Sequence, residues 1–128
     1  MSAAAYAQLA QVETARQYAR AAAEVADRWQ SRSWQAMADY ALGAAVRSAG
    51  DLDGARRQFL SAAETFEQIR QVFDVARCLL EAGRVDLGDQ AAAERRALLQ
   101  RARTLFHALG ARSAEARAAR ELATLNTR

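Results

Sequence analysis

The fold is decided by the stretch LGAAVRSAGDLDGARRQFLSA, residues 42–62. On both sides of Gly50-Asp51, small and apolar residues recur at intervals of three and four, which is the spacing of one face of a helix. Glycine readily adopts the left-handed backbone that ends a helix, and aspartate caps the first turn of the next helix. The stretch therefore predicts two antiparallel helices, one ending near Ala49 and one running from Asp51 to about Arg70.

Parts of this pattern recur at an interval of 40 residues. The recurring motifs are Ala15-Arg16 with Ala55-Arg56, and Ala22-Ala23-Glu24 with Ala62-Ala63-Glu64. Trp29, Ile69 and Leu109 occupy equivalent positions at the same step, and we expect all three in the core. A fixed period of this length is typical of helical repeats that stack one on another.

The flanking sequence is helix-compatible throughout. Residues 3–30 form either one long helix or two helices that break near Ala10-Gln11. Ser31 and Ser33 are both candidate caps for the helix that ends near Ala49. Further helices are predicted over about 74–87 and 91–108, the first of them followed by a second Gly-Asp pair, Gly88-Asp89, and a last helix is capped by Ser113. We expect an all-α chain of about six helices, with sequential helices antiparallel because the connections are short.

The composition supports this fold class. The chain has 128 residues, which suits a single domain, and it contains no proline. Apolar residues make up 52% of the sequence, but no apolar run is long enough to span a membrane. A lone cysteine, Cys78, fits a reducing compartment. We therefore predict a cytoplasmic protein with no membrane association.

The residues from Leu42 to Ala62 resemble the tetratricopeptide repeat. In that family a leucine-glycine pair and a large residue mark the first helix, here Leu42-Gly43 and Val46. An alanine, an aromatic residue and another alanine mark the second helix, here Ala55, Phe59 and Ala62. The step of 40 residues is similar to the extended repeats of bacterial regulators. The resemblance divides the single domain, residues 1–128, into a truncated repeat (about 1–31), a repeat (32–71), a degenerate repeat (72–110) and a last helix (111–128).

The resemblance also implies a binding surface. Tetratricopeptide arrays hold peptides or partner helices in a concave groove lined by the first helix of each repeat. The positions that correspond to this groove are Met37, Tyr40, Arg47, Arg77, Leu80, Arg84, Arg117 and Arg120. Four of these residues, Arg77, Arg84, Arg117 and Arg120, could also pair with carboxylates or phosphates. The alternative is that they form local ion pairs, such as one between Glu81 and Arg77. Trp34 is a further interface candidate if its side chain is exposed.

We therefore expect a non-catalytic module that binds a protein or peptide partner and that forms a homodimer if its open ends associate. One alternative is a regulatory or sensor segment of a larger bacterial transcription regulator or signalling enzyme. Another is an anionic small-molecule or nucleic-acid binder that uses the arginines. Residues 90–128 are basic but contain a single aromatic residue, Phe106, which argues against nucleic acid.

The sequence offers little for catalysis. His107 is the only histidine, and it falls near the C-terminal end of its predicted helix, where a cation is favoured. We expect Cys78 to act as a small apolar core residue. Asp51-x-Asp53-Gly54 resembles part of a calcium loop, but it lacks the terminal glutamate and is better interpreted as a helix cap. No metal and no cofactor are expected.

Overall fold

The computed structural model describes the backbone of residues 3–29 and 31–126, and the side chains of these residues except 4–7 and 29. Within this part, the chain forms six α-helices and one short 3-10 helix. Their bounds are α1 (Ala3–Trp29), α2 (Arg32–Ser48), α3 (Leu52–Gln68), α4 (Val72–Arg84), η1 (Asp89–Ala91), α5 (Ala92–Ala108) and α6 (Arg112–Asn126). The all-α expectation is therefore confirmed. Residues 3–29 form one helix of 27 residues, with no break near Ala10-Gln11.

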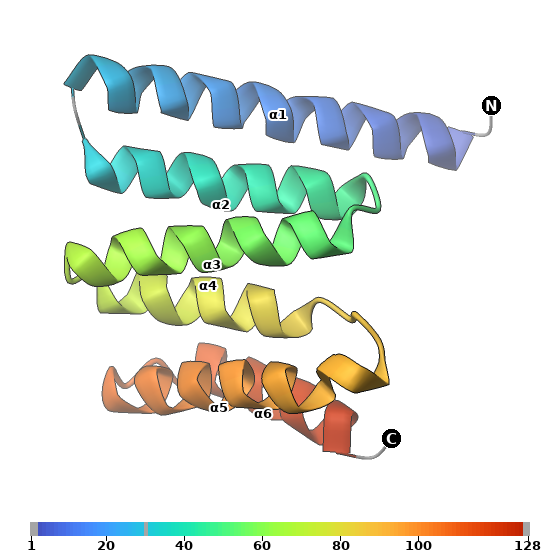
Figure 1. The fold of residues 1–128 in the computed structure, drawn as a ribbon, viewed down its shortest axis with the longest axis vertical. Helices are drawn as coiled ribbons and strands as arrows, with labels where there is room; N and C mark the ends of the chain where they lie inside the picture. Colours follow the sequence, from blue (N-terminus) through green and yellow to red (C-terminus); the bar gives the residue numbers. More distant parts are fainter. Residues whose placement is uncertain (1–2, 30, 127–128) are drawn as a thin grey trace.

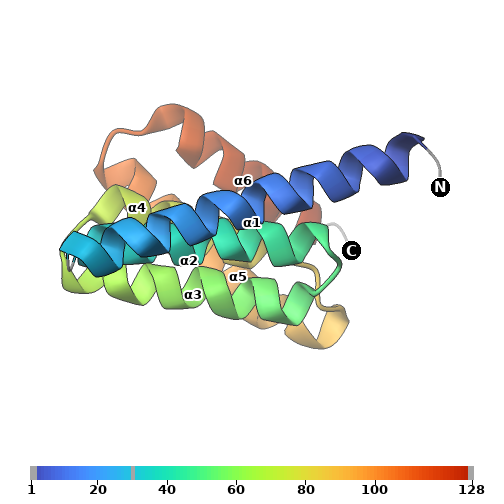
Figure 2. The same ribbon diagram turned by 90° about the horizontal axis from the view of Figure 1, so that it is seen from above.

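Each helix packs mainly against its neighbours in the sequence, in antiparallel order (Figure 1). α1 lies at one end of the stack, and α5 and α6 lie at the other. Figure 2, seen from above, places α4 and α6 on one side of the molecule and α3 and α5 on the other. Sequential antiparallel packing is therefore observed, although it does not by itself establish a repeat.

Three of the chain reversals share one hydrogen-bond pattern. After α2, α3 and α5, a residue with positive φ follows the C-terminal cap: Gly50 (φ 92°), Arg70 (φ 60°) and Gly110 (φ 69°). The amide of the next residue then donates to the carbonyl five positions back, at 2.9 to 3.0 Å. This is a Schellman turn, in which a left-handed residue satisfies the last free carbonyls of a helix.

The capping predictions are confirmed at the N-termini of α2 and α3 only. Asp51 Oδ1 accepts a hydrogen bond from Gly54 N at 2.9 Å, and Ser31 Oγ accepts one from Trp34 N at 3.3 Å. The prediction for Ser113 is wrong, because α6 already begins at Arg112 and Ser113 lies inside it. At the second Gly-Asp pair, Gly88 has φ 95°, but no side chain caps η1.

The predicted helix over 74–87 has different ends. α4 begins at Val72 and stops at Arg84, and Val85 has extended backbone (φ −73°, ψ 116°). The reason is Arg95, a residue of α5 that is only 6% exposed. Its Nε donates to the Gly83 carbonyl at 2.9 Å, and its Nη1 lies 3.5 Å from Asp86 Oδ1. The buried guanidinium thus satisfies the end of α4 and fixes the loop that follows.

The core is formed mainly by the five helices from α2 to α6. Its largest fully buried side chains include Phe59, Phe66, Phe106, Leu79, Leu80 and Leu99. At the α1–α2 contact, by contrast, the buried side chains of α1 are small: Val12, Ala19, Ala22 and Ala26. Among the described side chains, those that α1 buries are therefore smaller than the largest that α3, α4, α5 and α6 bury, and each removes less apolar area from water.

Leu52, at the start of α3, is 37% exposed. Leu109 was expected in the core but is 46% exposed, because it lies at the end of α5 beside a turn. Ile69, at the equivalent position, is partly buried against the core. The side chain of Trp29 lies outside the described residues. Among the helices that the structure describes, none is long and apolar enough to cross a membrane.

Candidate functional site

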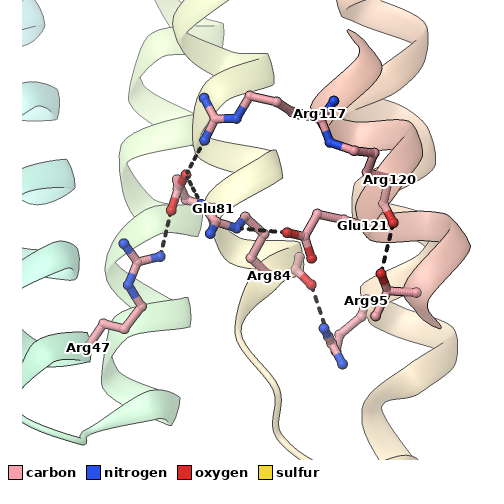
Figure 3. A network of polar contacts seen from close by, with 9 residues as sticks. Arg47, Glu81, Arg84, Arg95, Arg117, Arg120 and Glu121 are labelled. Atoms are coloured by element: carbon pink, nitrogen blue, oxygen red, sulfur yellow. Dashed lines mark hydrogen bonds and ion pairs between the residues drawn. The ribbon is translucent and has the colours of Figure 1, made fainter. Parts of the chain in front are cut away.

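A buried glutamate, Glu81 of α4, organises the polar contacts on one side of the stack (Figure 3). Its side chain is only 7% exposed. Arg47 Nη1 of α2 lies 2.5 Å from Glu81 Oε2, and Arg84 Nη1 lies 3.1 Å from Glu81 Oε1. Because a buried carboxylate is costly without partners, these contacts bind α2 to α4 as well as neutralise the charge.

The network continues to α6. Arg84 Nε lies 3.2 Å from Glu121 Oε1, and Arg117 Nη2 lies 3.9 Å from Glu81 Oε1. Arg120 has no ion pair with any of the described residues. A cleft of about 210 Å³ lies here, lined by Leu80, Arg84, Arg117, Arg120 and Glu121. We call it the arginine cleft.

A larger depression lies beside α1. It has a volume of about 620 Å³ and is lined by Ala10, Gln11, Thr14, Ala15 and Tyr18 of α1, by Met37, Tyr40, Ala41 and Ala44 of α2, and by Arg77 of α4. Most of these side chains are apolar, and Tyr18 is 49% exposed. We call this surface the apolar groove. It exists because small alanine side chains on α1 and α2 leave space between the larger ones.

Stacked side chains fix the inner wall of the apolar groove. The guanidinium of Arg77 lies over the Tyr40 ring, 4.5 Å from its centroid, and Tyr40 meets Phe59 edge to face at 5.3 Å. Arg77 Nη2 also donates to Asp74 Oδ1 at 2.9 Å. Burial raises the pKa of the Tyr40 hydroxyl, and nearby Glu81 raises it further, whereas Arg77 lowers it. Tyr40 is therefore neutral and held in place at physiological pH.

The predicted groove residues fall into two groups. Met37, Tyr40 and Arg77 line the apolar groove, whereas Arg84, Arg117 and Arg120 line the arginine cleft. Leu80 also borders the cleft but is only 2% exposed, and Arg47 is engaged by Glu81. The arginines predicted as one cluster are therefore divided between two surfaces, with Arg77 at the apolar groove and the other three at the arginine cleft.

Two features of the site were missed by the sequence reasoning. The local pair of Glu81 with Arg77 is not the one observed, because Asp74 pairs with Arg77 and Glu81 contacts three other arginines. Gln11, Thr14 and Tyr18 of α1 were also missed, because the groove was transferred only onto the first helix of each repeat. The small residues Ala10 and Ala15 lie on the same face of α1, and this run of small residues could have indicated that α1 lines a groove.

The remaining candidates show no reactive arrangement. Cys78 is fully buried, and burial raises the pKa of its thiol to about 12. His107 Nδ1 lies 3.0 Å from Glu115 Oε1 at the turn between α5 and α6. Across the described residues, no group of three or more His, Cys, Asp or Glu side chains could hold a metal ion. Trp34 is 41% exposed at the start of α2, so its side chain is accessible to a partner.

A scan against protein-family models finds no match to this chain, and a search of curated proteins finds none either. The resemblance to tetratricopeptide repeats therefore remains a prediction that depends on the residues quoted for it.

Proposed function

We propose that this protein is a non-catalytic, tetratricopeptide-like interaction module that binds an amphipathic helix of a partner protein in the apolar groove. The observation that carries this proposal is the groove itself, about 620 Å³ in volume and lined mostly by apolar side chains at the surface. Its size is that of many binding pockets, and a surface depression of this kind suits a helix that inserts a few large side chains.

The polar residues at the groove define the partner further. Gln11 and Thr14 lie on its α1 side, and Arg77 lies at its α4 side. A partner helix would bury apolar side chains against Met37 and Tyr40 and would place an acidic side chain near Arg77. Arg77 is already positioned by Asp74 and Tyr40, so little side-chain entropy is lost on binding.

A non-catalytic role and a cytoplasmic location belong to the same proposal. The thiol of Cys78 is buried and fully protonated at neutral pH, which argues against nucleophilic chemistry. A single unpaired cysteine in an alanine-rich helical chain fits a reducing compartment.

The test uses a displayed library of random 16-residue peptides, selected for binding to the full chain. Thr14→Arg places a long charged side chain in the apolar groove. Thr104→Arg is the matched control, because both threonines are exposed helical residues whose hydroxyls donate to the carbonyl four residues back. We expect the recovered peptides to lose about tenfold or more in affinity for Thr14→Arg and to bind Thr104→Arg as they bind the native chain. Recovery of no binding peptide, or equal losses in the two variants, would exclude the groove as the binding surface.

A further inference from the structure

The arginine cleft has more positive charge than its own acids neutralise. Its lining has three guanidinium groups, those of Arg84, Arg117 and Arg120, and one carboxylate, that of Glu121. A second carboxylate, Glu81, contacts Arg84 and Arg117 and also pairs with Arg47 of α2. The shortest contacts of Glu81 go to Arg47 and Arg84, one on each carboxylate oxygen.

Arg117 and Arg120 are the groups left under-satisfied. Arg117 reaches Glu81 only at 3.9 Å, and its side chain is 51% exposed. Arg120 makes no ion pair within the described part of the chain. Both are on α6, three residues apart, so their positive charges lie on one face of the helix and repel each other (Figure 3). An anion between them would remove this repulsion.

We propose that the arginine cleft binds an oxyanion, a carboxylate or a phosphate, between Arg117 and Arg120. Each guanidinium offers a planar set of N–H donors that matches two oxygens of such an anion. Arg84 lies at the cleft with its donors engaged by Glu81 and Glu121, so it adds positive potential but few free hydrogen bonds. The volume of about 210 Å³ accommodates a single oxyanion group with a small substituent.

This proposal is independent of the proposed partner groove. The apolar groove is lined by α1, α2 and Arg77, and the arginine cleft by α4 and α6. Either surface can therefore be tested while the other is intact.

The experiment is an NMR titration of the full chain labelled with ¹⁵N-arginine, at low ionic strength because salt screens exposed charges. The probes are inorganic phosphate and succinate, added separately. We expect the Nε–Hε signals of Arg117 and Arg120 to shift and to saturate with at least one probe. Tighter binding of phosphate would identify a phosphate as the ligand chemistry, and tighter binding of succinate a carboxylate. Both outcomes support the site.

Two double variants distinguish binding in the arginine cleft from nonspecific attraction of the anion to a positively charged protein. R117Q/R120Q should weaken the binding by about tenfold or more, because two charge-assisted contacts are lost. R103Q/R112Q removes the same charge from exposed residues outside the cleft and should change the affinity by less than about twofold. Glu121→Gln should strengthen binding, because it releases Arg84 Nε from a competing carboxylate. Shifts that rise without saturation for both probes, or equal weakening in the two double variants, would overturn the proposal.

Discussion

Gly43 determines how closely α2 and α3 approach each other. A Cβ atom at this position would lie 2.9 Å from Cε1 and 3.0 Å from Cδ1 of Phe59, which is fully buried. Alanine at an exposed helix position would stabilise the helix relative to glycine. At Gly43, the close contact of a new methyl group with the Phe59 ring should outweigh this gain, so alanine should destabilise the protein.

We expect Gly43→Ala to lower the free energy of unfolding by about 1–3 kcal/mol, the usual cost of overpacking a core. Urea denaturation measures it. In a Phe59→Leu background the same substitution should cost less, because a shorter side chain leaves room for the new methyl group. Unchanged or increased stability of Gly43→Ala in the native background would contradict the close contact.

The two Gly-Asp pairs provide a test of capping, because Asp51 is the N-cap of α3, whereas Asp89 lies inside η1 and Gly88 is the N-cap there. Asp51 accepts the amide of Gly54, whereas no side chain caps η1 at Asp89. Asp51→Ala should lower the free energy of unfolding by about 1 kcal/mol, whereas Asp89→Ala should change it by less than about 0.5 kcal/mol. Denaturant titration of both variants compares them, and equal losses would argue against the difference in capping.

Arg70 occupies the left-handed position that glycine fills in two equivalent turns. A side chain in this conformation costs about 1 kcal/mol, so Arg70→Gly should raise the stability by roughly that amount. Arg57→Gly, inside α3, is the contrasting variant and should lower stability by about 1 kcal/mol. Thermal unfolding followed by circular dichroism separates the two. A lower melting temperature for Arg70→Gly would show that its backbone is not strained.

At the scale of the elements, α1 differs from the other helices. It packs mainly against α2, and among its described side chains the buried ones are three alanines and one valine. α4 packs between α3 and α5 and buries Val75, Leu79 and Leu80. The two helices should therefore differ in local stability.

Native-state hydrogen exchange should give opening free energies for amides of residues 11–26 that are about 2–4 kcal/mol lower than those of α4. The amides of α3, which is also packed on both sides, are the control and should resemble α4. Equal protection of α1 and α4 would show that the chain unfolds as one cooperative unit.

The sequence predicts the number and order of the helices well, because helical periodicity and the absence of proline act locally. It predicts their ends less well. α4 stops at Arg84 because the side chain of Arg95, from the next helix, bonds to the Gly83 carbonyl. α6 starts before Ser113 because the turn at Gly110 already supplies the reversal. Such ends depend on contacts between helices, which a local pattern does not contain.

At the scale of the whole molecule, the separation of the predicted arginines into two surfaces could not be inferred from their spacing. Arg77 and Arg84 lie on the same helix, but Arg77 is drawn to Tyr40 and Asp74, and Arg84 to Glu81 and Glu121. The difference arises because Tyr40 of α2 lies beside Arg77, whereas Glu121 of α6 lies beside Arg84. Self-association stays a prediction, and light scattering over a range of concentrations would test it.

Glu81 connects α2, α4 and α6, so its removal should affect the whole stack. We expect Glu81→Gln to lower the free energy of unfolding by about 1–3 kcal/mol, the range for losing hydrogen bonds to charged partners. Glu67→Gln is the control, because Glu67 pairs with Arg101 on the surface, with side chains 60% and 51% exposed, and should cost about 0.5 kcal/mol or less. Equal effects in urea denaturation would mean that Glu81 contributes no more than a surface ion pair.

The sequential order of the stack has a mechanical consequence. Because each helix packs mainly against the one before it and the one after it, and because α1 and α6 lie toward opposite ends of the stack, a pulling force applied through α1 and α6 would load these contacts in series (Figure 1). Under load, α1 would detach first, since alanine contacts resist the least, and the remaining helices would release their length in separate steps. The chain would then extend under tension in steps rather than in one event.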